Sequence, residues 1–359
     1  MTVADMEFSA PPEVNEAVCR AAMHGCYGYT GPQGEYLEAV KHWQKTRHNW
    51  DIDEDWYVVT NGVVQALGIA VRAFTEPGDG VLIMTPVYHP FYGAVNDNGR
   101  KLYESPLIAN NGRYEIDFAD LEAKAAEENV KLMLLCSPHN PIGRVWSRDE
   151  LCRVAQIAKK NDVIVVSDEI HNDLIVGDKE HTVFASIEGA KDNCIVCTAI
   201  SKTFNLAGLS CSNIFVPNPA LKEKFAEQAH TDGCGCVPYI ARFATIAAYT
   251  KGGEWLDELL ETVKGNFDLL YRFIEERLPM FTVTRAEGTY RAWIDMRSLG
   301  MGHEALTEFL VTKARIADND GEMFGPAGDG FRRWNLALPK EELYSALLRL
   351  ENAVNEFLK

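Results

Sequence analysis

The sequence predicts an α/β fold: a large domain with a mostly parallel central sheet, followed by a smaller α+β domain at the carboxyl end. Short Val-, Ile- and Leu-rich runs alternate with helical patterns through the middle of the chain, which is typical of a parallel sheet covered on both faces. A long amphipathic stretch and mixed patterns follow it. The 359 residues exceed a typical domain of roughly 100–200 residues, which favours two domains.

The elements of the large domain follow from these patterns in order. Because continuous apolar runs are typical of buried strands, strands are expected at residues 56–60, 80–84, 131–136, 163–167 and 194–197. Helical spacing of the apolar residues predicts helices over 62–74 and 148–161.

The pattern changes after residue 251. One amphipathic helix is expected over 254–277, strand-like segments over 281–284 and 288–295, and helices over 303–314 and 340–358. The predicted organisation is therefore an amino-terminal segment at 1–34 that packs on the small domain, a large domain at 35–252 and a small domain at 253–359.

Composition and charge exclude several classes of protein. Lys and Arg number 35 against 52 Asp and Glu, a net charge of -17, which argues against nucleic acid and anionic membranes as partners. No apolar run is long enough for a membrane span, and the start lacks the pattern of a signal peptide. The nine cysteines show no zinc-ligand spacing, so no metal site is predicted. Free thiols point to a reducing compartment, and we expect a cytoplasmic protein.

Chemically active residues follow the ends of the predicted strands. Ligands of open parallel sheets bind outside the carboxyl ends of the strands. The residues found there are Asn61-Gly62-Val63-Val64, Tyr88, Asn140, Asp168, His171, Ser201 and Lys202. Taken singly, each has an ordinary structural explanation: a helix cap, a turn former, a core aromatic or a surface charge. Taken together, a lysine beside an acid and an aromatic ring suits a cofactor bound as a Schiff base.

Several motifs carry a resemblance over essentially the whole chain. They are Val3-Ala-Asp-Met-Glu-Phe, Gly28-Tyr-Thr-Gly-Pro, Pro86-Val-Tyr-His-Pro-Phe, Ser137-Pro-His-Asn-Pro-Ile-Gly, Ser167-Asp-Glu-Ile-His-Asn-Asp-Leu, Ser201-Lys-Thr-Phe-Asn-Leu-Ala-Gly-Leu and Phe331-Arg-Arg-Trp-Asn. The chain resembles the fold-type I pyridoxal-phosphate enzymes of the aspartate aminotransferase superfamily, and within them the MalY/PatB-type cystathionine β-lyases. The resemblance implies a transferase-like large domain that binds pyridoxal 5′-phosphate.

The resemblance also implies a role for each residue. Lys202 would carry the cofactor, Asp168 would pair with its ring nitrogen, Asn140 would donate to its phenolic oxygen, and Tyr88 would stack on its ring. Asn61, Gly62, Val63 and Val64, with Ser201, would hold the phosphate. His171 is a further candidate at the cofactor. Tyr29 would reach the phosphate of a neighbouring subunit, which implies a homodimer with shared sites. Arg333, rather than Arg332, would bind the substrate carboxylate. Ser210 stands where many aminotransferases have a phosphate-binding Arg.

Three functions remain open from the sequence. The first is a carbon–sulfur lyase that eliminates the thiol from L-cystathionine or a similar cysteine S-conjugate, giving pyruvate and ammonia. The second is an aminotransferase that uses the same residues. The third is a pyridoxal-phosphate-binding regulatory protein that acts through a partner. The motifs favour the lyase.

Overall fold

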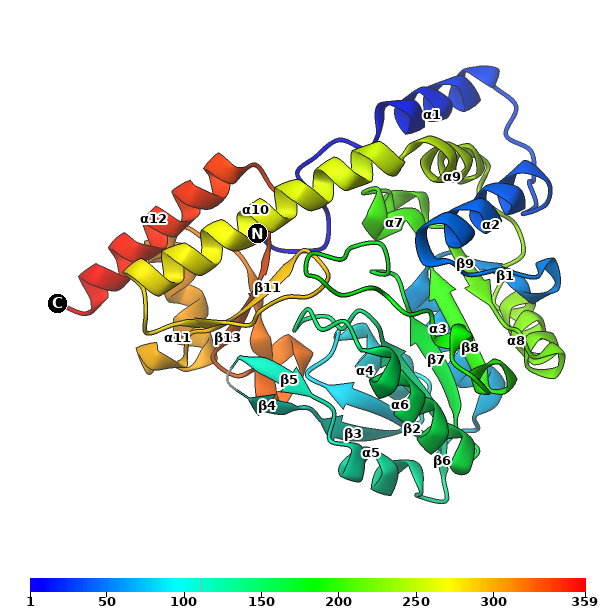
Figure 1. The fold of residues 1–359 in the computed structure, drawn as a ribbon, viewed down its shortest axis with the longest axis horizontal. Helices are drawn as coiled ribbons and strands as arrows, with labels where there is room; N and C mark the ends of the chain where they lie inside the picture. Colours follow the sequence, from blue (N-terminus) through cyan, green and yellow to red (C-terminus); the bar gives the residue numbers. More distant parts are fainter. Residues whose placement is uncertain (111) are drawn as a thin grey trace.

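The computed structural model describes residues 1–110 and 112–359 and is built around a seven-stranded sheet with the order β1-β9-β8-β7-β6-β2-β3 (Figure 1). The strands are β1 (Tyr57–Thr60), β9 (Ser212–Phe215), β8 (Cys194–Thr198), β7 (Ile164–Asp168), β6 (Val130–Cys136), β2 (Gly80–Thr85) and β3 (Lys101–Pro106). Neighbouring strands are parallel except at β9, which runs antiparallel to β1 and β8. The expectation of a mostly parallel sheet is confirmed.

Two apolar cores cover the two faces of this sheet. Along β2, Val81 and Ile83 belong to one core, whereas Leu82 and Met84 belong to the other, because successive side chains of a strand point to opposite faces. The first core includes α3 (Val63–Phe74), α4 (Pro90–Asn96) and α8 (Pro219–Thr231). The second includes α5 (Phe118–Ala125), α6 (Arg148–Lys160), α2 (Glu35–His48) and α9 (Tyr239–Lys251). Cys194 and Cys197 on β8 are fully buried, as expected for small apolar side chains.

The long helix α10 (Gly253–Arg277) leads from α9 to a four-stranded antiparallel sheet with the order β10-β11-β13-β12 (Figure 1). Its strands are β10 (Thr282–Val283), β11 (Arg291–Asp295), β13 (Phe331–Asn335) and β12 (Asn319–Asp320). α12 (Lys340–Phe357) packs on α10, and α11 (His303–Phe309) continues into a π-helical turn at Leu310–Ala314. A separate hairpin pairs β4 (Ile108–Asn110) with β5 (Arg113–Glu115).

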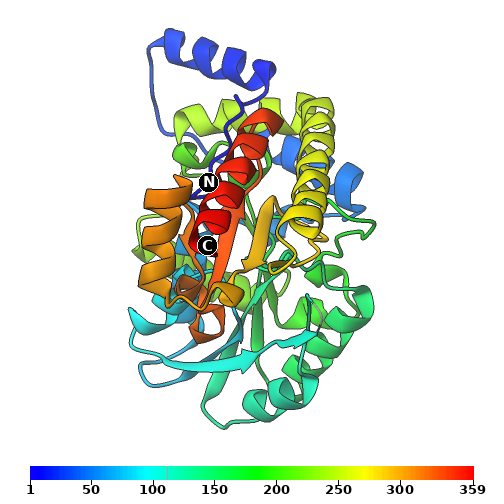
Figure 2. The ribbon, with the colours of Figure 1, turned by 90° about the vertical axis from the view of Figure 1, so that its left-hand side faces the viewer.

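The amino-terminal segment contacts both parts of the molecule. The helix α1 (Pro12–His24) packs on α9, while the residues before it run toward the small sheet (Figure 2). Asn335 on β13 donates to the Asp5 carbonyl, and the Asn205 side chain bonds Met6 and Phe8. Within the described ranges, none of the helices combines the length and hydropathy of a membrane span.

Candidate active site

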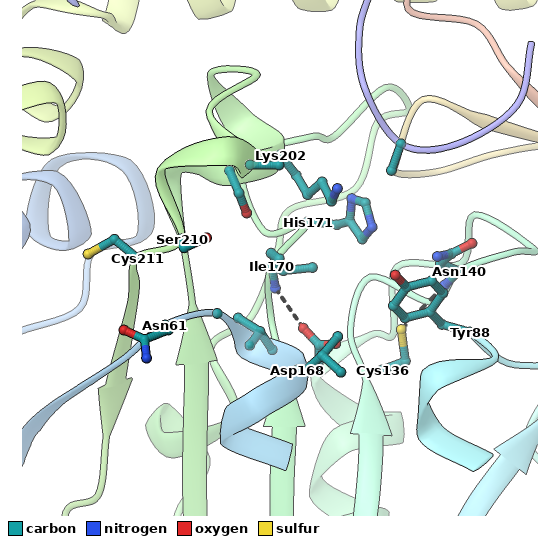
Figure 3. A pocket seen from close by; sticks show the side chains of 16 residues that line it. Asn61, Tyr88, Cys136, Asn140, Asp168, Ile170, His171, Lys202, Ser210 and Cys211 are labelled. Carbon is teal, nitrogen blue, oxygen red and sulfur yellow. Dashed lines mark hydrogen bonds between the residues drawn. The ribbon is translucent and has the colours of Figure 1, made fainter. Parts of the chain in front are cut away.

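A cavity of about 160 Å³ lies at the carboxyl edge of the parallel strands (Figure 3). It brings together the residues that were singled out at the predicted strand ends. Its lining contains Asn61, Gly62, Val63, Val64, Tyr88, Asn140, Asp168, His171, Ser201 and Lys202. Strands β1, β2, β6, β7 and β8 each deliver part of this set because they end at the same edge of the sheet.

The start of α3 is an open anion site. Gly62 has a φ of +146°, a conformation that side-chain-bearing residues rarely adopt, and no atom lies within 4 Å of where a Cβ would stand. Among the described residues no side chain caps the helix, so the first N–H groups, beginning at Val63, remain available to a ligand. Together with the helix dipole, these groups suit a phosphate.

Asp168 is the last residue of β7, and its carboxylate forms no ion pair with residues 1–110 or 112–359. Its buried carboxylate accepts a hydrogen bond from the Ile170 N–H at 3.1 Å, drawn as a dashed line in Figure 3. Burial raises its pKa to about 7, helped by the neighbouring Glu169 carboxylate. A protonated pyridine nitrogen is the kind of partner that would hold Asp168 ionised, so this site fits the ring of pyridoxal phosphate.

Lys202 lies on the short helix α7 (Ile200–Thr203), and its amine points toward the ring of His171 (Figure 3). Burial and the Arg291 guanidinium lower the pKa of Lys202 to about 8, so about one tenth of the amine is unprotonated at pH 7. Burial and Lys202 in turn hold the pKa of His171 well below its usual value. The Nδ1 atom of His171 has no hydrogen-bond partner in the described part of the chain.

Arg333 reaches the cavity from β13 through Asn140. Its Nη1 donates to Asn140 Oδ1 at 3.0 Å and its Nη2 to Asn319 Oδ1 at 2.8 Å. Both acceptors are neutral amides, so the charge of this buried guanidinium is not compensated by either of them. Burial and Arg291 lower its pKa to about 9. Tyr88 lies beside Asn140 in Figure 3, and burial raises its pKa.

Arg332 has the opposite environment although it is adjacent in sequence. It is buried and pairs with Asp318, with Nη2 to Oδ1 at 2.5 Å, and with Asp320, with Nη1 to Oδ2 at 2.9 Å. Since the charge of Arg332 is already neutralised by two carboxylates, its role is to hold the fold rather than to bind an anion. Of these two neighbours in the sequence, Arg333 is the one with capacity for a further anion.

Tyr29 is absent from the cavity of its own chain. Its side chain is 99 % exposed and lies in a surface hollow together with Asn61 and Tyr239.

Sequence reasoning missed several residues at the site. Ala4 and Cys211 line the cavity, as does Ser210, which the sequence flagged only as a missing arginine. Arg291 on β11 acts electrostatically on Lys202, His171 and Arg333. A charged residue inside the apolar run Tyr-Arg-Ala-Trp-Ile was the signal that could have identified it.

The comparisons with known proteins extend over the whole chain. The family model "Aminotransferase class I and II" matches residues 1–350. "Cystathionine beta-lyase PatB" of Bacillus subtilis (strain 168) is 39% identical over 356 residues, which cover 99% of this chain and 92% of PatB. "Protein MalY" of Escherichia coli (strain K12) is 33% identical over 355 residues, which cover 98% of this chain and 90% of MalY.

Solved structures give the same picture. Cystalysin from Treponema denticola, whose crystal structure contains a pyridoxal 5′-phosphate cofactor, superposes with a TM-score of 0.97 at 44% identity, covering 100% of this chain and 91% of that one. The pyridoxal-phosphate-bound C-S lyase from Staphylococcus hominis superposes with a TM-score of 0.93 at 35% identity. The superposition covers 98% of this chain and 90% of that one.

Proposed function

The chain belongs to the aminotransferase class I and II family, and from this premise we propose that it is a pyridoxal-phosphate-dependent carbon–sulfur lyase. Its substrate would be L-cystathionine or a similar S-conjugate of cysteine. The observation that carries the lyase activity is the full-length similarity to the cystathionine β-lyase PatB, at 39% identity. The buried Asp168 carboxyl, whose pKa burial raises, and the Lys202 amine, whose pKa burial lowers, line one cavity and support the cofactor.

We propose that the cofactor is held by the residues whose groups match it. Lys202 would bind the aldehyde carbon of the cofactor, and Asp168 would pair with its ring nitrogen. Asn140 would donate a hydrogen bond to its phenolic oxygen, and Tyr88 would stack on the face of its ring. The phosphate would lie on the start of α3, from Asn61 to Val64, with Ser201 beside it. The uncapped N–H groups that begin at Val63, and the open space beside Gly62, support this placement. His171, at the same cavity, would contact the cofactor or the substrate.

The bound cofactor would withdraw electrons from the Cα of the substrate and so make the loss of its proton feasible. The chain supplies orientation and proton transfer. Arg333 would bind the α-carboxylate, which fixes the Cα–H bond relative to Lys202. The Lys202 amine would accept the Cα proton and return a proton to the departing sulfur. The carbon–sulfur bond breaks, and addition of one water gives the free thiol, pyruvate and ammonia.

The decisive experiment offers L-cystathionine without a keto acid. The lyase releases thiol and pyruvate in equal amounts under these conditions, whereas an aminotransferase needs an amino-group acceptor. Lys202→Ala should abolish release, while Lys159→Ala, an exposed lysine on α6, should leave it unchanged. Activity that appears only after a keto acid is added would contradict the lyase and favour the aminotransferase.

We further propose a cytoplasmic homodimer with shared sites and the domain limits 1–34, 35–252 and 253–359. The exposed Tyr29, in a surface hollow that Asn61 also lines, supports a contribution from the partner subunit. Free thiols at all nine cysteines support a reducing compartment. Sedimentation of the holoenzyme tests the dimer, and Tyr29→Phe tests its contact with the phosphate through the affinity for pyridoxal phosphate.

A further inference from the structure

Arg291 is a buried cation that forms no ion pair with the residues that the structure describes. Its side chain stands at the start of β11 with 1% of its surface exposed. None of its three guanidinium nitrogens has a hydrogen-bond partner in the described part of the chain. The guanidinium lies 4.4 Å from the centre of the Tyr290 ring, a contact with an uncharged side chain that supplies no counter-ion. An unpaired charge in the interior destabilises the fold. A buried guanidinium without a counter-ion from the chain is therefore a candidate site for an anion from outside.

The sheet register directs Arg291 to the same face as Arg333. In the antiparallel pair of β11 and β13, Arg291 stands opposite Asn335, and Trp293 stands opposite Arg333. Side chains of opposed residues share a face, and diagonal neighbours on that face are within reach of each other when they are long. Arg333 uses this face to reach Asn140 at the cavity. Arg291 therefore adds a second positive charge on the side of the small sheet that faces the site.

Two other buried arginines show how this chain neutralises a structural guanidinium. Arg332 pairs with Asp318 and Asp320, and Arg144 pairs with Glu150 and Glu287. Arg291 has no ion pair of this kind among the described residues. The acid that acts on it electrostatically, Asp5, is exposed to solvent. The missing anion is therefore expected to come from a ligand.

The anions of the proposed reaction already have binding groups, except one. The start of α3 suits the phosphate, and Arg333 suits the α-carboxylate. Cystathionine carries a second carboxylate on the half that leaves with sulfur. We propose that Arg291 binds this second carboxylate and selects cysteine S-conjugates with an anionic leaving group over those with an uncharged one. The proposal rests on the proposed function for its substrate class.

The test compares two substrates on the holoenzyme. The ratio of kcat/KM for L-cystathionine to that for S-propyl-L-cysteine should fall by about 10- to 100-fold in Arg291→Met, which is the range expected for losing a hydrogen bond to a charged group. The ratio cancels effects that Arg291 has on Lys202, because both substrates need the lysine equally. Arg285→Met is the matched control: this exposed arginine stacks on Tyr271 as Arg291 stacks on Tyr290, away from the cavity. An unchanged ratio in Arg291→Met would overturn the proposal.

A second measurement needs no turnover. Suberate carries two carboxylates about as far apart as those of cystathionine, and octanoate carries one. In the parent chain, which carries no substitution, suberate should raise the melting temperature more than octanoate does. This difference should vanish in Arg291→Met and in Arg291→Gln. Both variants should themselves melt above the parent chain in the absence of ligand, because an unpaired buried charge has been removed. Variants that melt below the parent and keep the suberate effect would show a structural role instead.

The two measurements separate the two proposals. If the holoenzyme releases pyruvate from neither substrate, the lyase fails, but the suberate comparison still decides whether Arg291 binds a second carboxylate. If S-propyl-L-cysteine is cleaved and the cystathionine ratio does not respond to Arg291→Met, the lyase stands and the role of Arg291 is refuted.

Discussion

The electrostatics of Lys202 predict how fast the apo chain takes up its cofactor at each pH. Burial, Arg291 and Arg333 lower the pKa of the Lys202 amine from its ordinary value of 10.5 to about 8. Because only the neutral amine attacks an aldehyde, about one lysine in ten is reactive at pH 7, against about one in three thousand at the ordinary pKa, a gain of about 300-fold.

The assay mixes the apo chain with pyridoxal phosphate between pH 6 and 10, traps the product with borohydride and quantifies the modified peptide by mass spectrometry. The rate at Lys202 should rise about tenfold per pH unit up to pH 8 and then level off. The exposed Lys251, labelled in the same samples, is the control for changes in the reagent itself. Arg291→Met and Arg333→Met should each move the midpoint upward, because each removes a positive charge that lowers this pKa. A rate at Lys202 that keeps rising tenfold per unit up to pH 10 would refute the reasoning.

Three further predictions concern Asp168, Arg144 and Arg333. Between about pH 4 and pH 7 the folded apo chain keeps a proton on Asp168 that the unfolded chain has released, so stability falls as the pH rises through this window. Asp168→Asn should therefore stabilise the apo chain at pH 8 by as much as about 4 kcal/mol in urea unfolding, and no gain there would contradict the burial of an ionisable group. Arg144→Met should cost about 3–5 kcal/mol because it strands Glu150 and Glu287, whereas loss of an exposed lysine should cost under about 1 kcal/mol in the same assay. Arg333→Lys should lower kcat/KM about 10- to 100-fold for anionic and neutral leaving groups alike, since a lysine cannot form the paired hydrogen bonds; unchanged kinetics would remove Arg333 from the carboxylate site.

The sequence predicts the parallel strands that are buried on both faces, whereas the more exposed β3, which is parallel to β2, was missed. β2, β6, β7 and β8 all begin and end within one residue of the expected positions, and the family and cofactor read from the motifs are confirmed. β9 was missed because it contains Ser212 and Asn213, which do not resemble a buried strand. The Asn213 side chain is accommodated by the hydroxyls of Tyr36 and Tyr57, which donate to it at 2.8 and 2.6 Å. Such long-range partners leave no local pattern.

At the candidate site, too, residues whose role depends on long-range partners could not be predicted from the sequence. Residues at strand ends could be found because their position in the chain fixes their place at the edge of the sheet. Arg291 could not be assigned in this way, because its burial depends on how β11 pairs with β13 and on how the small sheet faces the large one. The contrast between Arg332 and Arg333 likewise depends on Asp318 and Asp320, whose positions only the folded chain reveals.

The contacts of the first residues with Asn205 and Asn335 bear on the order of folding. These hydrogen bonds join residues that are 199 and 330 positions apart in the chain. Closing such long loops is slow relative to forming local helices. During synthesis the amino-terminal segment emerges first but must wait for β13 before its last partner exists. One wall of the cavity, at Ala4, is therefore completed late, after the carboxyl-terminal strands have formed.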